Sequence, residues 1–189
     1  MMKYISLILI CLGISVSSSA ITAQDTINPR KFSNITFEKA LFDKVNSYRK
    51  ANSMKPYLFN QLIHNAAYDH AIYLGRTGKL THEQDNLKTK TVYDRVRRHI
   101  HSSRFVVGEN LARTVILKPS MNYNSQGKAS LSTAMTYEEA ATYVFNAWKK
   151  SDFHNKNMLS GKYSISAIAV HFNPEESSVT SVQVFAHFG

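Results

Sequence analysis

Apolar residues recur at helical spacing twice in the first half of the chain. Phe37, Leu41, Val45 and Tyr48 follow one another at intervals of four, four and three, so they lie on one face of a helix. The polar run 51–55 ends that pattern. A second helix should begin near position 60, and its apolar stripe consists of Leu62, Ile63, Ala66, Ala67, Ala71 and Leu74. Two amphipathic helices are therefore predicted.

The second half of the chain changes from helical spacing to alternation. Thr136 and Glu139 have the spacing of a capping box, and the helix that follows carries Trp148 on its inner face. A short helix is expected over 152–159. Residues 163–172 and 179–188 are rich in Val, Ile and Phe and predict two strands joined by a polar turn. Helices first and a hairpin last indicate an α+β domain.

Between these halves the pattern is weaker. The basic segment 93–99 predicts a short helix. Residues 113–135 lack periodicity and are rich in Ser, Asn and Lys, so they are interpreted as a long loop. Lys88, Lys90, Arg95, Arg97, Arg98 and Arg104 make this region the most basic of the chain. We interpret it as a solvated face or as a contact for anionic material.

The N-terminal segment has the pattern of a secretory signal peptide. Lys3 precedes a nearly continuous apolar run of twelve residues, and small residues follow it. Cleavage is expected after Ala20 or Ala23, with Ala23 favoured. The expected organisation is a signal peptide over 1–23, a flexible leader over 24–35 and one domain over 36–189. Twelve apolar residues are too few to span a bilayer, so no transmembrane span is expected after cleavage.

The amino-acid composition excludes several kinds of site and points to a class of partner. The chain has 189 residues, of which 43% are hydrophobic, and this suits one globular domain. Its only cysteine, Cys11, leaves with the signal peptide, which excludes a cysteine nucleophile, a disulfide framework and a thiolate metal site. The formal charge of +10 favours anionic partners. Export makes nucleic acid an unexpected partner, and we expect an anionic extracellular or envelope component instead.

Three short strings carry a resemblance to a known family. They are Thr81-His82, the run Gly-Glu-Asn-Leu-Ala at 108–112, and Trp148 followed by Ser151 and His154. Together with the segments around them they resemble, in order, the bacterial branch of the CAP superfamily (SCP domain), which includes cysteine-rich secretory, antigen five and pathogenesis-related proteins. The resemblance runs from about Phe37 to Phe185.

The resemblance implies a three-layer α-β-α sandwich with a surface cleft lined by two histidines and two acids. It assigns the histidines to His82 and His154 and the first acid to Glu109. Ser151 stands where animal and plant members have the second acid, so mechanisms that need two acids are in doubt here. The lining expected for the cleft is therefore His82, Glu109, Ser151 and His154.

The residue types themselves are consistent with a site. Two imidazoles and a carboxylate are a plausible ligand set for a divalent metal such as Zn²⁺, with His82 and His154 as ligands and Glu109 as a possible third. The same three residues are candidates for proton transfer. Structural alternatives stay open: the histidines could hold loops together, Glu109 could bind backbone N–H groups, and Ser151 could cap the following helix.

Two further residues near these strings have structural interpretations. Arg95 is expected to form a structural ion pair, and His70 is expected to be a buried histidine with its hydrogen bonds satisfied.

Two functional classes remain open at this point. The first is a secreted or periplasmic, monomeric binding module for a small ligand, lipid, peptide or glycan. The second is a hydrolase, either metal-dependent or assisted by a His/Glu pair. The missing second acid and the absence of a persuasive nucleophile favour the binding module. Fold alone does not decide between the two.

Overall fold

The computed structural model describes residues 20–100, 102, 104–123 and 129–189. Most of the predicted signal peptide, including Cys11, lies outside the described residues. Within them, no helix is both long enough and apolar enough to cross a bilayer.

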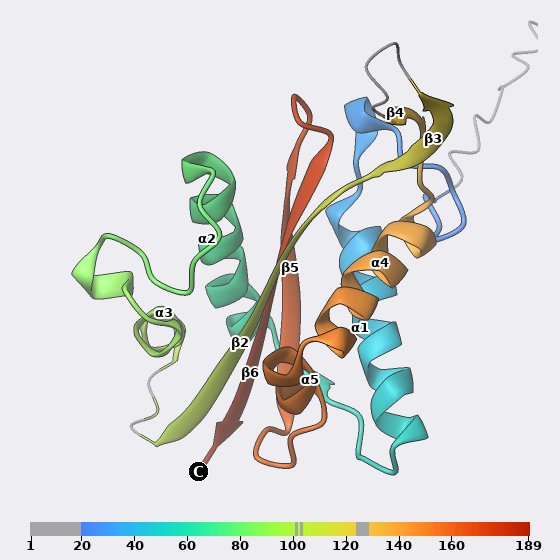
Figure 1. Ribbon diagram of the computed structural model, residues 1–189. Helices are drawn as coiled ribbons and strands as arrows, with labels where there is room; N and C mark the ends of the chain where they lie inside the picture. The colour runs from blue at the N-terminus through green and yellow to red at the C-terminus, as the bar shows by residue number, and fades with distance from the viewer. Residues whose placement is uncertain (1–19, 101, 103, 124–128) are drawn as a thin grey trace, which may run out of the picture.

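The fold has three layers (Figure 1), as the resemblance implies. The middle layer is a four-stranded sheet with strand order β1-β5-β6-β2, formed by β1 (Leu58–Phe59), β5 (Ile165–Asn173), β6 (Ser178–Phe188) and β2 (Phe105–Val115). One face is covered by α1 (Asn34–Ala51), α4 (Tyr137–Lys150) and α5 (Asp152–Met158). The other face carries α2 (Gln61–Thr77) and α3 (Val92–His99). Short 3-10 turns lie at Pro29–Lys31 and Leu87–Thr89.

Local signals in the sequence set the ends of several helices. The side chain of Asn60 accepts hydrogen bonds from the first backbone N–H groups of α2, and Gly78 ends that helix with a φ of 68°. Thr136 and Glu139 form the predicted capping box at the start of α4. The predicted helices at 37–48, 93–99 and 152–159 are also present as α1, α3 and α5.

The predicted C-terminal hairpin is present, and it lies at the centre of the sheet. Strands β5 and β6 pair antiparallel from Ile165↔Ala186 to Asn173↔Ser178. Strand β2, which the sequence pattern did not predict, pairs with β6 along its whole length. Strand β1 adds only two residues, in parallel, to the outer edge of β5.

The segment 113–135 is not a loop, as the sequence had suggested. It contains the end of β2 and a separate two-stranded hairpin of β3 (Leu117–Tyr123) and β4 (Ala129–Ala134). Backbone bonds at its base join Met135 N to Ile116 O at 2.7 Å and Ile116 N to Ser177 O at 2.9 Å. Register shifts beside Pro119 interrupt the pairing. Such bulges break strict alternation, which explains why the sequence showed no strand period.

The segment 24–35, expected to be a flexible leader, is docked on the domain. Ile27 is only 2% exposed, and its N–H donates to Met135 O at 2.9 Å. Helix α1 already begins at Asn34, after an N-cap at Ser33. Phe32 also packs on the domain, with its ring stacked on Phe172 at a centroid distance of 4.5 Å, so two apolar side chains in a polar stretch hold the segment in place.

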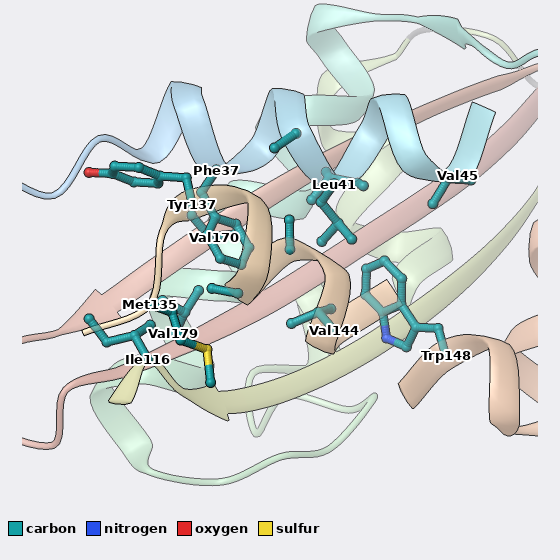
Figure 2. Packing of buried hydrophobic residues seen from close by; sticks show 14 of the residues in the cluster. Phe37, Leu41, Val45, Ile116, Met135, Tyr137, Val144, Trp148, Val170 and Val179 are labelled. Atoms are coloured by element: carbon teal, nitrogen blue, oxygen red, sulfur yellow. The ribbon is translucent and has the colours of Figure 1, made fainter. Parts of the chain in front are cut away.

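Large side chains fill the space between the sheet and helices α1 and α4 (Figure 2). Phe37 and Leu41 of α1 meet Tyr137 and Trp148 of α4, and all four are 0–1% exposed. The indole Nε1 of Trp148 donates to Leu111 O of β2 at 3.0 Å. This bond satisfies the one polar group of a buried tryptophan and fixes the end of α4 against β2, where the candidate site begins.

Candidate functional site

A buried ion pair forms the base of the site. The side chain of Glu109 in β2 is 2% exposed, and its Oε2 accepts from Arg95 of α3 at 2.7 Å. Arg95 is fully buried and also donates to the backbone carbonyls of Thr89, Lys90 and His82. The predicted structural role of Arg95 is confirmed. Because a buried charge needs a partner, this pair fixes both the carboxylate and the loop that carries His82.

His82 lies against the other oxygen of the same carboxylate. Its Nδ1 is 2.9 Å from Glu109 Oε1. A carboxylate oxygen only accepts, so Nδ1 carries the proton and donates. This leaves Nε2 of His82 as the free ring nitrogen, and it has no hydrogen-bond partner among the described residues. The His82 side chain is 58% exposed, so that nitrogen is available to a ligand.

His70 of α2 lies beneath this pair and is fully buried, as predicted. Its Nε2 donates to Thr81 O at 2.9 Å, and its Nδ1 accepts from the Gln84 amide at 3.0 Å. Burial lowers the pKa of His70 to about 4. The nearby Glu109 carboxylate, 3.7 Å from Nε2, only partly offsets this. His70 is therefore a neutral structural histidine that holds the loop before His82.

His154 comes to the same end of the sheet on α5. Asn110 donates to the His154 backbone carbonyl at 3.1 Å, and Asn157 bonds to Asn110 Oδ1 at 3.0 Å and to Glu109 O at 3.3 Å. These amide contacts attach α5 to β2. The pKa of His154 is lowered, first by partial burial and then by the charge of His82. The amide contacts therefore hold the helix that carries His154 beside Glu109.

Ser151 does not cap α5, and Gly108 makes room for a neighbouring ring. Ser151 occupies the N-cap position of α5, but its side chain makes no capping hydrogen bond. Gly108 lies in the extended strand β2, not in a tight turn. A Cβ at Gly108 would lie 2.5 Å from the hydroxyl of Tyr163, so the glycine makes room for that ring. The structure shows no hydrogen bond from Ser151 to His82, Glu109 or His154.

A hollow of about 650 Å³, lined by both polar and apolar side chains, lies beside the loop that carries His82. Thr81 and Glu83, the two neighbours of His82 in the sequence, line it together with Gln84 and Lys90. Leu80 and Leu87 also line it, so the hollow offers both hydrogen-bonding and apolar groups.

The site offers few free donors for a metal ion. Among the described residues, no group of three or more His, Cys, Asp or Glu side chains is arranged to hold one. Both oxygens of Glu109 already have partners in Arg95 and His82. What remains is a pair of imidazoles, His82 and His154, with Glu109 behind His82 as the carboxylate that orients a ligating histidine. Metal binding by His82 and His154 therefore stays a prediction from the sequence.

The sequence contains a signal for the burial of Arg95. It contains none for Gln84, which supports the site through His70 and was not predicted. Arg95 is three residues after Val92 and one before Val96, so it lies on the inner stripe of a short basic helix. An arginine at such a position indicates a buried acidic partner. Gln84 has no comparable signal, because its contact with His70 depends on the path of the loop between α2 and α3.

Comparisons with known proteins agree with this architecture. The model of the CAP family, described as the cysteine-rich secretory protein family, matches residues 42–185. An outer surface protein of Borrelia burgdorferi superposes with a TM-score of 0.64 at 18% identity, over 84% of this chain and 98% of that one. A comparison with curated proteins gives no significant match.

Two other bacterial structures share the fold over part of their length. An extracellular SCP-domain protein of Bacillus anthracis gives a TM-score of 0.58 at 18% identity, covering 80% of this chain and 40% of that one. A cysteine-rich secretory protein of Staphylococcus aureus gives 0.52 at 14% identity, covering 82% and 39%. At these identities the likeness shows a common fold.

Proposed function

The chain belongs to the cysteine-rich secretory protein (CAP) family, and from that premise we propose that it is a binding protein whose site is the His82–His154 pair. One observation carries the proposal. Both oxygens of Glu109 are engaged, by Arg95 at 2.7 Å and by His82 at 2.9 Å. A carboxylate held in this way cannot move to a substrate, but it fixes the His82 ring with Nε2 free. The site is built to present an imidazole.

The ligand class follows from the surroundings of His82. The residues on either side of His82 in the sequence line the nearby hollow, together with Gln84 and Lys90. A small polar ligand, a peptide or a glycan with an oxygen or nitrogen donor would suit this surface better than a purely apolar molecule. The net charge of the chain favours an anionic partner outside the cytoplasm.

A divalent ion such as Zn²⁺ is part of this proposal. His82, through Nε2, and His154 would hold it, and Glu109 would orient the His82 ring. When bound, the ion would supply a Lewis-acid contact to a ligand oxygen or nitrogen. With two protein ligands the affinity would be modest, so the ion and the ligand would strengthen each other's binding.

Hydrolysis is the second candidate, and the Glu109–His82 contact favours it. A histidine oriented by a carboxylate has the arrangement of a general base, with the lone pair on Nε2 available to accept a proton. Hydrolysis also needs a group that protonates the leaving atom. Ser151 stands at the position where the family resemblance expects the second acid, and this leaves the binding function better supported.

Export to the cell surface or beyond completes the proposal. Two of the solved relatives are described as an outer surface protein and an extracellular protein, and the N-terminal pattern is that of a signal peptide. Residues before position 24 contact the domain: Thr36 Oγ1 donates to Ile21 O at 3.2 Å, and Glu138 N donates to Ala23 O at 2.8 Å. A cut after Ala20 would keep both contacts, so we place the mature N terminus at Ile21.

Calorimetric titration with ZnCl₂ tests the site. His82→Ala and His154→Ala should each weaken Zn²⁺ binding by at least about tenfold, and Glu109→Gln by about 10- to 100-fold through misorientation of the His82 ring. His187→Ala is the matched control, because His187 is an exposed histidine of β6, and among the described residues its side chain hydrogen-bonds only to Ser164. Circular dichroism would verify that each variant is folded.

Two outcomes would contradict the proposal. Zn²⁺ binding that is unchanged in both His82→Ala and His154→Ala would remove the assigned site. A peptide-library cleavage assay, run with and without Zn²⁺, would address the second candidate. Robust turnover that is lost in Glu109→Gln would establish hydrolysis and overturn the preference for a binding protein.

A further inference from the structure

One arginine of the basic segment faces a hollow that the proposed function does not use. Two other cations of this segment are already paired, since Arg95 is buried against Glu109 and Lys90 lies 3.4 Å from Glu83. Arg98 is exposed near the end of α3, and among the described residues it forms no ion pair and no hydrogen bond. It lines a hollow formed by α2, α3 and the loop between them.

This hollow lies where α2 and α3 are neighbours on the same side of the sheet (Figure 1). It has a volume of about 590 Å³, within the range of about 300–1,000 Å³ that is typical of ligand sites. Arg76 of α2 also lines it. Like Arg98, it is exposed and has no ion pair or hydrogen bond within the part of the chain that the structure describes. Two free cations therefore face one hollow.

Few acidic groups offset these two arginines. Asp69 is the one carboxylate among the described residues that line the hollow, and its Oδ2 is 2.9 Å from His99 Nε2. Asp85 accepts from the hydroxyl of Tyr73 at 2.9 Å and lies 3.3 Å from Lys79 Nζ. The hollow therefore favours an anionic occupant. A guanidinium group matches a carboxylate best, because it can donate two parallel hydrogen bonds to it.

The two arginines reach the hollow at different points along α2. The contact between His99 and Asp69 places the end of α3, and with it Arg98, beside Asp69. Arg76 follows Asp69 by two turns of α2, about 10 Å along the helix axis. An extended chain with repeated negative charges matches this separation better than a single small anion does.

The uncharged part of the lining favours a sugar chain over a peptide. Tyr68 and Tyr73 contribute aromatic rings, and Tyr68 is 43% exposed, so the C–H groups of a sugar ring can pack against it. Asn86 and Thr77 add exposed hydrogen-bonding side chains that suit hydroxyl groups. The two helices that border the hollow pair their own backbone groups, so they offer a peptide no strand edge.

We propose that the hollow between α2 and α3 binds an acidic polysaccharide whose sugar units carry carboxylates. Arg98 and Arg76 each pair with a different carboxylate of the chain, and one of its sugar rings packs on Tyr68. Neither His82 nor His154 lines this hollow. The inference therefore adds a second site and does not rest on the proposed function.

An NMR titration of the full chain with trigalacturonate, in buffer that contains EDTA, tests the proposal. The signals of Tyr68 and Ile72, which line the hollow, should shift as the sugar is added. The fully methyl-esterified trisaccharide has the same rings and linkages without the charges. It should bind about tenfold more weakly, because it cannot form the charge-assisted hydrogen bonds.

Neighbouring arginines of α3 provide the matched variants. Arg98→Gln and Arg76→Gln should each weaken binding about tenfold, because one charged pair is lost. Arg97→Gln removes the same charge from an exposed position of α3 outside the hollow, so it should weaken binding less than about twofold. Tyr68→Ala should weaken binding about fivefold, whereas Tyr143→Ala, at a 57% exposed tyrosine of α4, should leave it unchanged.

Three results would overturn the proposal. They are no signal shift at millimolar trigalacturonate, equal affinity for the methyl ester, or an equal loss in Arg97→Gln, which would assign the binding to net charge alone. Tighter binding of the peptide acetyl-Glu-Glu-Glu-amide would identify an acidic peptide as the occupant instead. EDTA removes Zn²⁺ from these titrations, and the Zn²⁺ titrations contain no sugar, so each proposal can fail without the other.

Discussion

The two faces of the central sheet are packed in opposite ways. Toward α1 and α4, the sheet meets large side chains, among them Phe37, Leu41, Tyr137, Trp148 and Phe185. Toward α2, many of the residues are small: Ala66, Ala67 and Ala71 of the helix lie in one cluster with Ala167, Ala169 and Ala186 of the strands, beside larger residues such as Ile63, Leu74 and Val182. The first face contains the larger side chains, and the alanines of the second let a helix backbone come close to the sheet.

This difference indicates that one face mainly stabilises the fold and the other mainly positions the candidate site. Burial of large apolar side chains is the main source of folding free energy, so the α1/α4 face should carry most of it. On this side of the sheet, Arg95 of α3 bonds to Glu109 of β2 at 2.7 Å, and His70 of α2 lies 3.7 Å from the same carboxylate. The candidate site is therefore supported from the small-residue face, and a change there should alter the site before it unfolds the protein.

The largest effect should come from the large-residue face. Trp148→Ala should lower the free energy of unfolding by about 3–5 kcal/mol, through lost burial and the cavity left behind. Chemical denaturation would measure it. Phe153→Ala is the control, because Phe153 lies in the next helix, α5, and is 84% exposed. Its free energy of unfolding should hardly differ from that of the wild type. A loss below about 1 kcal/mol in Trp148→Ala would contradict the division between the faces.

The sequence predicted the large-residue face better than the rest of the fold. Helical spacing found Phe37, Leu41 and Trp148, and the capping box marked the start of α4. Alternation found β5 and β6. Strand β2 was missed because Glu109 and Asn110 interrupt its apolar pattern, and these buried polar residues are satisfied by Arg95, His82 and Asn157 from distant segments. Long-range contacts of that kind leave no local period.

The family resemblance identified the residues of the candidate site, and the structure revealed the hydrogen bonds that hold them in place. His82, Glu109 and His154 are too far apart in sequence for spacing to link them. The hydrogen bond between His82 and Glu109, and the engagement of the second carboxylate oxygen by Arg95, depend on how α3 docks against α2.

A smaller effect, confined to the α2 face, should appear on acidification. His70 is neutral in the folded protein because burial lowers its pKa from 6.5 to about 4, whereas the unfolded chain takes up the proton near pH 6.5. The stability that depends on a neutral His70 is therefore fully present above pH 6.5, and it is lost as the pH falls from 6.5 toward 4. The loss should reach about 3 kcal/mol.

Denaturation curves at a series of pH values would measure this loss. His70→Gln removes the titrating ring, so its stability should change less between pH 7 and pH 4 than that of the wild type. The destabilisation caused by Trp148→Ala should be the same at both pH values, because that residue contacts no titrating histidine. Equal pH dependence in the wild type and His70→Gln would assign the acid sensitivity to other groups.

The smallest effect tests how closely α2 approaches the sheet. A Cβ on Gly75 of α2 would lie 1.8 Å from Cδ2 of the His171 ring on β5. Alanine normally stabilises a helix interior by about 1 kcal/mol over glycine. Gly75→Ala should instead destabilise the protein by about 1–3 kcal/mol, because the ring or the helix must move.

The sign of the effect identifies its cause. In a His171→Ala background the ring is absent, so Gly75→Ala should become stabilising by about 1 kcal/mol. A double-mutant cycle by chemical denaturation would measure the coupling between the two positions. If Gly75→Ala also stabilises the wild type, α2 is free to shift away from β5. The small-residue face would then not fix the distance between α2 and the sheet, and the position of His70 relative to Glu109 depends on that distance.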